Sequence, residues 1–272
     1  FKPGFPVQAR ELTTLQSQLQ NQIESFGSHI FKDGSMVIPG AISYDGTYYS
    51  IRIKDEHLGI PVSLYLDQLI GKTLKGQTTG ITLKIDSYLL AGTSSEINDL
   101  TIFVTYVESG SSNEISYLND GEILITQESF VYGNTAVNQG ETILTLVDDN
   151  ASALGSAVGI SSGTYFIRGS FVDVSTDKIV LDPYTNDSSY RVGLNIDEEI
   201  VTAKDDDSLY DNARGFSNYA APGADRFKIT TTLAKKSLTD YNDTNFIELI
   251  RIKEGEIQSL INDPQYLSLI HI

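Results

Sequence analysis

The hydrophobic positions near the N-terminus repeat with the period of an α-helix. Between residues 8 and 31 the apolar side chains lie three or four residues apart, close to the 3.5-residue spacing of a coiled-coil seam. The six residues of this apolar stripe are Leu12, Leu15, Leu19, Ile23, Phe26 and Ile30. Gln, Ser, Thr and Asn occupy the opposite face, with few charges. We expect an amphipathic helix whose stripe either packs on its own domain or self-associates with copies of the chain.

From Met36 onward the pattern changes to short segments rich in Ile, Val, Thr and Tyr. Breaks with Gly, Asp, Asn or Ser separate these segments. This pattern is typical of an all-β sandwich or barrel, and residues 63–75 also fit a helical turn. The sequence therefore predicts a mainly β protein, with several sandwich- or barrel-like regions of short strands and one N-terminal amphipathic helix.

The Gly/Ser-rich stretch at 151–162 suggests a boundary between two β regions. We expect an N-terminal segment at 1–35, a β domain at 36–150, a linker at 151–162 and a second β domain at 163–266. The last six residues, 267–272, read LSLIHI, which matches a translation of a sequencing adapter and would make the chain a fragment of a longer gene. A short apolar strand is the alternative interpretation of these six residues.

The composition of the chain excludes several classes of partner and of chemistry. The net charge of −17 and the pI near 4.4 repel nucleic-acid phosphates and anionic membrane surfaces. No apolar run is long enough to cross a bilayer, so we expect neither a nucleic-acid partner nor membrane insertion. The absence of cysteine excludes disulfides, thiolate nucleophiles and Cys-ligated metals within this sequence.

Two short strings resemble catalytic or phosphate-binding motifs, but each lacks a residue that the motif needs. The string GISSG would make Ser161 a nucleophile, but the histidine that follows it, His271, lies in the suspected adapter. The GKT at 71–73 lacks the glycine of a phosphate-binding loop, because Leu66 stands at that position. His29 and His57 are too far apart to form a local metal signature, and we expect His29 at the helix end or on the surface.

The candidate metal ligands lie in an acidic run, DDDSLYD, at 205–211. Asp205, Asp207 and Asp211 could supply several oxygen ligands to a hard cation. The spacing does not match an EF-hand, because Leu209 stands at its fifth position. Clustered aspartates more often turn and cap the backbone, so we expect a structural loop and no resident cofactor.

The second half of this loop is rich in small residues. Gly215 and residues 220–223, AAPG, would allow close approach of the backbone. Arg214 and Arg226 would pair with the nearby aspartates.

Four blocks of the chain resemble a family of virion structural proteins of tailed phages, notably T4-like phages of marine cyanobacteria. The blocks cover residues 1–40, GTYFIRGSFVDV at 163–174, YRVGLNIDEEIV at 190–201 and SLYDNARGFSNYAAPGADRFKI at 208–229. The resemblance implies a virion location in the tail baseplate or fibre, other tail proteins as partners, and no catalytic residues. Homo-oligomers are common among such proteins, and the helical stripe suits this form of assembly.

Two rival functions follow from other features. A receptor- or glycan-binding adhesion module of the tail would bind the host surface through exposed tyrosines, for example Tyr48, Tyr49 and Tyr219. A capsule depolymerase would need a pair of carboxylates across a groove. We expect no enzymatic activity, because nothing in the sequence marks such a pair.

Overall fold

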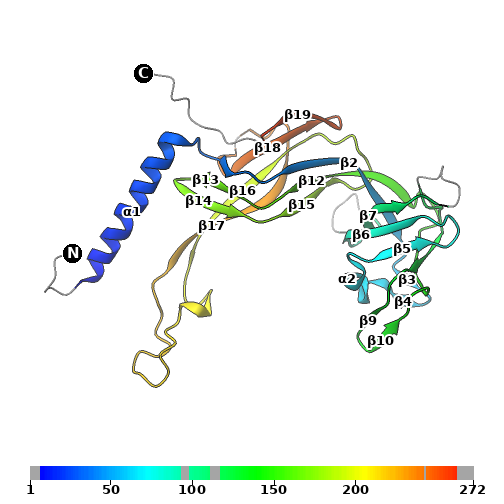
Figure 1. Ribbon diagram of the computed structural model, residues 1–272, viewed down its shortest axis with the longest axis horizontal. Coiled ribbons are helices and arrows are strands. Elements are labelled where there is room, and N and C mark those ends of the chain that lie inside the picture. Colours follow the sequence, from blue (N-terminus) through cyan, green and yellow to red (C-terminus); the bar gives the residue numbers. More distant parts are fainter. Residues whose placement is uncertain (1–6, 93–97, 111–116, 242, 262–272) are drawn as a thin grey trace.

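The computed structural model describes residues 7–92, 98–110, 117–241 and 243–261. These residues form a mainly β structure with one long N-terminal helix, as the sequence predicts. Figure 1 shows an arched β body with three projections: a helix at one end, a long hairpin beside it, and a compact group of short strands at the other end. The predicted adapter at 267–272 lies outside the described residues and stays a prediction.

Helix α1 (Ala9–Ile30) confirms the expected span of 8–31. At its start the backbone N–H of Gln8 donates to Glu11 Oε2 at 2.7 Å, which satisfies a backbone donor beside the first turn. At its end the N–H of Phe31 donates to the Gly27 carbonyl at 2.7 Å. Gly27 is the buried residue of the helix, so packing on the rest of the chain contributes little along most of its length.

The largest sheet has eight antiparallel strands. In spatial order they are β11 (Thr142–Thr145), β8 (Ile123–Thr126), β5 (Thr73–Gly76), β6 (Thr82–Leu89), β7 (Leu100–Glu108), β2 (Ile42–Ile53), β12 (Ser152–Ile160) and β15 (Asp177–Asp182).

A four-stranded and a three-stranded sheet form the other end of the body. The first has the order β17 (Arg226–Ser237), β16 (Tyr190–Val201), β18 (Phe246–Lys253) and β19 (Glu256–Leu260). The second has the order β1 (Ser35–Ile38), β13 (Gly163–Ile167) and β14 (Ser170–Val174).

Short elements complete the fold. Two-stranded pairs are β3 (Glu56–His57) with β4 (Ile60–Pro61), and β9 (Phe130–Tyr132) with β10 (Thr135–Val137). Two single helical turns come after β4. They are η1 (Val62–Leu64) and α2 (Leu66–Leu69), and a helical turn within 63–75 is expected from the sequence. A further turn, η2 (Asp207–Leu209), lies in the acidic loop.

The predicted linker at 151–162 is wrong. Most of it forms strand β12, which pairs with β2 on one side and β15 on the other. Its small residues serve close packing: a Cβ on Gly155 would lie 2.7 Å from the Pro183 carbonyl oxygen. The composition that suggests flexibility therefore reflects a crowded strand.

The hydrophobic residues form two main cores. One draws its buried residues from positions 51–151, and the other from Met36, Ile42 and positions 158–252. Strand β2 contributes to both, with Ile42 in one core and Ile51 and Ile53 in the other. The eight-stranded sheet thus runs from one core into the other and connects the compact end to the projections (Figure 1).

His57 is a buried histidine in β3. Its Nδ1 lies 2.8 Å from the Thr145 hydroxyl and its Nε2 3.1 Å from the Thr142 hydroxyl, both on β11. Burial lowers the pKa of His57 below its usual 6.5, so the folded protein favours the neutral ring.

Acidification is therefore expected to destabilise the protein before its carboxylates titrate. The unfolded chain protonates His57 near pH 6.5 whereas the folded chain resists it, so the stability falls as the pH is lowered from about 7.5 to about 5.5. A His57→Gln variant should lose this part of the pH dependence, measured as the difference in Tm between the two pH values. The exposed His29, replaced by Gln, is the matched control and should keep it. Equal pH dependence in His57→Gln and the parent would contradict this assignment.

Candidate assembly surface

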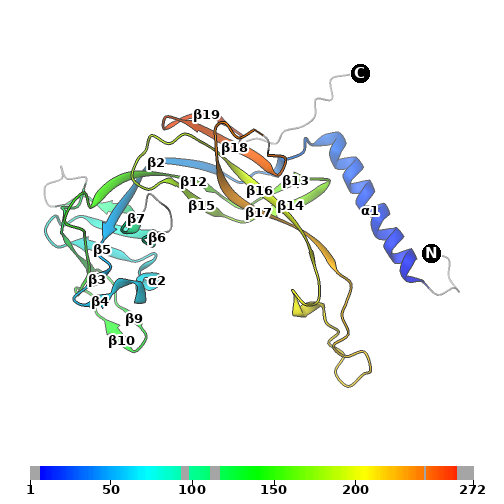
Figure 2. The same cartoon turned by 180° about the vertical axis from the view of Figure 1, so that it is seen from behind.

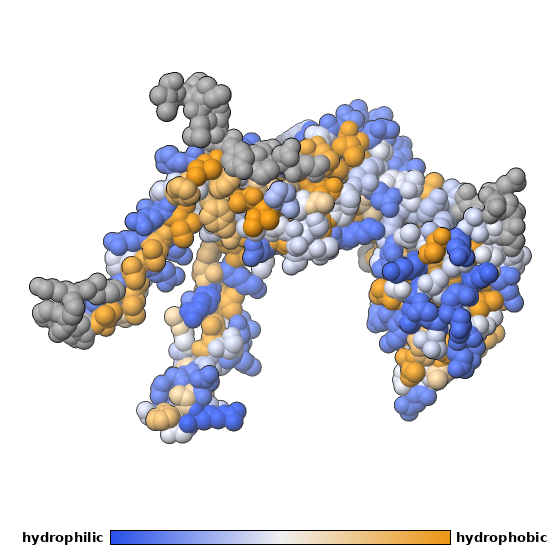
Figure 3. Space-filling model, in the orientation of Figure 1, coloured by the Kyte–Doolittle hydropathy of each residue, from blue (hydrophilic) through white to orange (hydrophobic). Residues whose placement is uncertain are grey.

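The apolar stripe of α1 is open to solvent. Its first five residues are between 42% and 66% exposed, and the sixth, Ile30, is half-buried. Figure 3 shows a line of apolar side chains along the helix. Of the two interpretations of the stripe, packing on its own domain is wrong for this chain, because the helix projects away from both cores.

The last turns of α1 pack against the hairpin of β13 and β14. Gly27 packs against the Phe166 ring so closely that a Cβ there would clash with it. A Cβ on Gly169 would lie 2.6 Å from Cγ of Glu24. The direction in which the helix projects is therefore set by close contacts that admit only glycine.

Strands β16 and β17 form a hairpin that extends beyond the β body (Figure 2). The strands pair over twelve residues, from Tyr190–Ser237 at the base to Val201–Arg226, which spans about 40 Å. We call β16, β17 and the intervening loop 202–225 the hairpin arm. Figures 1 and 2 show α1 and the hairpin arm leaving the same end of the body.

The part of the hairpin arm that extends beyond the β body also exposes apolar side chains. Ile200 and Phe227, which are cross-strand partners, are 59% and 57% exposed. Phe216 and Tyr219 at the tip are 71% and 52% exposed. Contiguous exposed apolar side chains are typical of surfaces that bind other proteins or ligands.

The candidate metal ligands Asp205 and Asp211 bond to nearby turns. Asp205 Oδ2 accepts from the backbone N–H of Thr202 at 3.0 Å and from its hydroxyl at 2.7 Å, and these bonds hold the pKa of Asp205 below its usual value. Asp211 accepts from the Ala213 N–H and from Asn218 Nδ2. Asp207 begins the helical turn η2. Within the described ranges no three His, Cys, Asp or Glu side chains lie together as metal ligands would.

The arginines of this loop do not bond as expected. Arg226 Nη1 donates to the backbone carbonyl of Ala224 at 2.9 Å, and the ion pairs found among the described residues include neither Arg226 nor Arg214. The expected close approach of the backbone is found at Gly223, where a Cβ would lie 2.6 Å from the Leu209 carbonyl oxygen. Gly215 has open space around it and instead adopts a φ of +87°.

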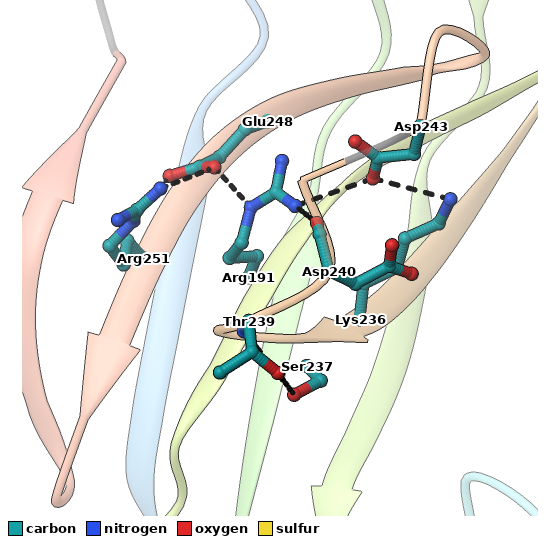
Figure 4. Close-up of polar contacts among 8 residues, drawn as sticks. All are labelled: Arg191, Lys236, Ser237, Thr239, Asp240, Asp243, Glu248 and Arg251. Atoms are coloured by element: carbon teal, nitrogen blue, oxygen red, sulfur yellow. Dashed lines mark hydrogen bonds and ion pairs between the residues drawn. The ribbon is translucent and has the colours of Figure 1, made fainter.

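Three cations lie side by side at the base of the hairpin arm (Figure 4). Arg191 on β16 is directly opposite Lys236 on β17 and Arg251 on β18. Like charges in this arrangement destabilise a sheet unless anions separate them. We call these three side chains, with Asp243 and Glu248, the charge row.

Two carboxylates neutralise the charge row. Glu248 accepts from Arg191 Nε at 2.5 Å and from Arg251 Nε at 2.8 Å. Asp243 Oδ2 lies 3.3 Å from Lys236 Nζ and 3.4 Å from Arg191 Nη1. Arg191 is 6% exposed and contacts both carboxylates, so it joins the two halves of the row.

Charge pairing outweighs burial in the charge row. Burial alone would raise the pKa of Glu248, but its hydrogen bonds from Arg251 and Arg191 lower it. Burial would lower the pKa of Arg191, and its bond to Glu248 raises it instead. Arg191 Nη1 also donates to the Asp240 carbonyl, which fixes the loop that follows β17. The row therefore anchors the hairpin arm at the end opposite its free tip.

The catalytic motifs occupy structural positions. The Ser161 hydroxyl accepts from the Ala41 N–H at 2.5 Å in the turn between β12 and β13. Two carboxylates, Asp173 and Asp177, line a cleft of about 300 Å³, and Asp173 accepts from the Thr164 hydroxyl while Asp177 accepts from the Lys178 N–H. Both acids hold local structure, and the absence of enzymatic activity stays a prediction.

The tyrosines proposed for sugar stacking are not equivalent. Tyr48 is buried and stacks on Phe103 at a ring distance of 5.1 Å, so the expectation that it is exposed is wrong. Tyr49 is half-buried against Tyr106. Tyr219 alone of the three is exposed, so these residues do not form a shared platform.

Comparison with known proteins identifies a family for the chain. Residues 106–271 match a family described as a domain of unknown function (DUF4815). No curated protein and no solved structure matches the chain. Among the described helices, none has the length and apolar character needed to cross a membrane.

Proposed function

The chain belongs to the family of the domain of unknown function DUF4815, and we propose that it is a virion structural protein of a tailed phage. In this proposal it acts by assembly in the tail baseplate or fibre and not by catalysis. Its partners are copies of itself and other tail proteins. The alternative function is that of a receptor- or glycan-binding adhesion module of the tail. The residues that it would use are the exposed Tyr219 and Phe216 at the hairpin tip.

The exposed apolar stripe is the observation that carries the proposal. Each half-exposed Leu, Ile or Phe side chain that becomes covered contributes about 1 kcal/mol. Five such residues on a projecting helix therefore favour association by several kcal/mol before its entropic cost. The helix carries only Arg10, Glu11 and Glu24 as charged residues, so the net charge of −17 opposes contact between helices weakly.

The blocks that resemble phage structural proteins support the same interpretation. Residues 1–40 contain α1, and residues 163–174 form the β13–β14 hairpin that holds it. Residues 190–201 are β16, and residues 208–229 form most of the hairpin tip and the start of β17. These four blocks therefore include both projections at this end of the body and the attachment of α1, which are parts available to partners.

Two measurements test this function. Immunogold labelling of virions from a phage that carries this gene should mark the tail, and sedimentation of the purified protein should show concentration-dependent oligomers. Label on the capsid, or no label on intact virions, would contradict the tail assignment. A protein that stays monomeric at all concentrations would contradict assembly through the stripe.

A further inference from the structure

A cleft lies between α1 and the hairpin arm. It has a volume of about 440 Å³ and walls from three elements: Ile23 of α1, Phe171 of β14 and Phe227 of β17. These three side chains are between 44% and 57% exposed. We call this space the junction cleft. Its apolar walls face solvent within a strongly acidic protein.

The wall on the hairpin arm is a continuation of a core face. Leu194 and Ile196 of β16 are buried, and Ile200 lies on the same face because successive side chains of a strand alternate. Glu198 lies between Ile196 and Ile200 on this face and forms an ion pair with Arg168. Phe227 is the direct partner of Ile200 and shares that face. The apolar face therefore extends past the part of the sheet that the chain itself covers.

The apolar stripe fits such a trough. Its steps from Leu12 to Ile30 average 3.6 residues, the repeat of a straight helix, so the stripe does not drift around the axis. A stripe that does not drift suits a contact with the junction cleft of another molecule better than a long supercoil. The α1 of the same chain forms one wall of the cleft and cannot also fill it.

We infer that the junction cleft receives the α1 helix of a second copy of this chain. This inference rests on the proposed self-assembly and names its contact. Because α1 is itself a wall of the cleft, a two-fold pair places each α1 in the cleft of the other copy at once.

The available surface is sufficient for such a pair. The exposed apolar residues of the stripe and the cleft, together with Ile200 beside Phe227, are Leu12, Leu15, Leu19, Ile23, Phe26, Phe171, Ile200 and Phe227. At roughly 100 Å² for each half-exposed side chain, they would bury on the order of 800 Å² per copy, the size of a standard interface.

Electrostatics also permits this pairing. The charged groups on the walls of the cleft are Glu24 and Arg168, and Arg168 forms an ion pair with Glu198 at 2.6 Å. The incoming helix brings one basic and two acidic residues. The contact therefore joins two nearly neutral surfaces, which is favourable for a chain that is strongly acidic elsewhere.

The chain has no cysteine, so disulfide cross-linking between single-cysteine variants tests this contact directly. Proteins with Leu12→Cys, Leu15→Cys or Leu19→Cys are each mixed, under mild oxidation, with a size-tagged protein that carries Phe227→Cys. Any mixed disulfide is then intermolecular and is resolved by its size on a non-reducing gel. We expect at least one stripe position to give about fivefold more mixed product than a size-tagged Val131→Cys control, which is 61% exposed on β9 at the far end of the body.

The other outcomes separate the two proposals. Disulfides that join two stripes, with none from the stripe to Phe227→Cys above the control, would overturn this inference and leave self-assembly intact. Parent protein that is monomeric at every concentration would overturn both. Because all five substituted side chains are exposed, the variants should fold as the parent does, and circular dichroism checks this.

Discussion

A protein that carries Leu15→Asp and Leu19→Asp together is expected to remain monomeric at concentrations where the parent protein forms oligomers. Association of two copies would place these carboxylates in an apolar contact without partners, and burying an unpaired charge is costly. We expect the dissociation constant to rise at least about 100-fold, equivalent to about 3 kcal/mol. Analytical ultracentrifugation over a range of concentrations measures this change.

The fold of this double variant should be preserved. Leu15 and Leu19 are 42% and 51% exposed and lie outside both cores, so the Tm should change little. The matched control is Ser17→Asp with Asn21→Asp, which adds the same charges at the same spacing on the opposite face of α1. Weaker association in the control as well would assign the effect to charge in general and contradict the role of the stripe.

Periodicity predicts the helix but not its surroundings. The six apolar positions define α1 within one residue at each end, because the repeat and the flanking residues are local properties. Whether the stripe is covered depends on where the helix is attached. That attachment involves Gly27, Phe166 and Gly169, residues far apart in the sequence, and it cannot be read from the repeat.

Composition was misleading in strand β12. A run rich in Gly and Ser has low strand propensity, and the sequence gives no sign that a neighbouring strand approaches it closely. The same limit applies to Tyr48, whose burial follows from its place between Phe103 and Lys178 in the folded sheet.

The hairpin side of the candidate surface was missed, although a signal was present. Phe227 and Ile229 alternate with polar residues, and Ile200 directly follows the polar pair Glu198 and Glu199. This alternation predicts an apolar strand face. It does not predict that the apolar face extends beyond the hydrophobic core, because that depends on the length of the elements that pack against the strand.

The charge row also arises only in the folded sheet. Arg191 is 45 residues from Lys236 and 60 residues from Arg251 in the sequence, and the register of β16 with β17 and β18 makes the three neighbours. No pattern in the sequence marks them as a group. They define the last prediction, because Arg191 is the member of the row that contacts both carboxylates.

Replacing Arg191 with Leu is expected to destabilise the protein by about 3 kcal/mol, measured by urea denaturation. Removing one partner of a buried ion pair costs about 3–5 kcal/mol, and the lower value applies because Arg251 and Lys236 still neutralise Glu248 and Asp243. The Asp240 carbonyl also loses a hydrogen-bond donor.

A matched control distinguishes the centre of the charge row from its edge. The Arg251 side chain is 33% exposed, and Glu248 keeps its bond to Arg191 when Arg251 is replaced by Leu, so this variant should lose about 1 kcal/mol or less. Arg191→Lys should not restore the parent stability, because one ammonium group cannot reach Glu248, Asp243 and the Asp240 carbonyl as the forked guanidinium does.

If Arg191→Leu were as stable as the parent, apolar packing would replace the row, and the hairpin arm would have to be anchored by its backbone pairing alone. If the two Leu variants lost equal stability, burial would not be what distinguishes Arg191 from its neighbour.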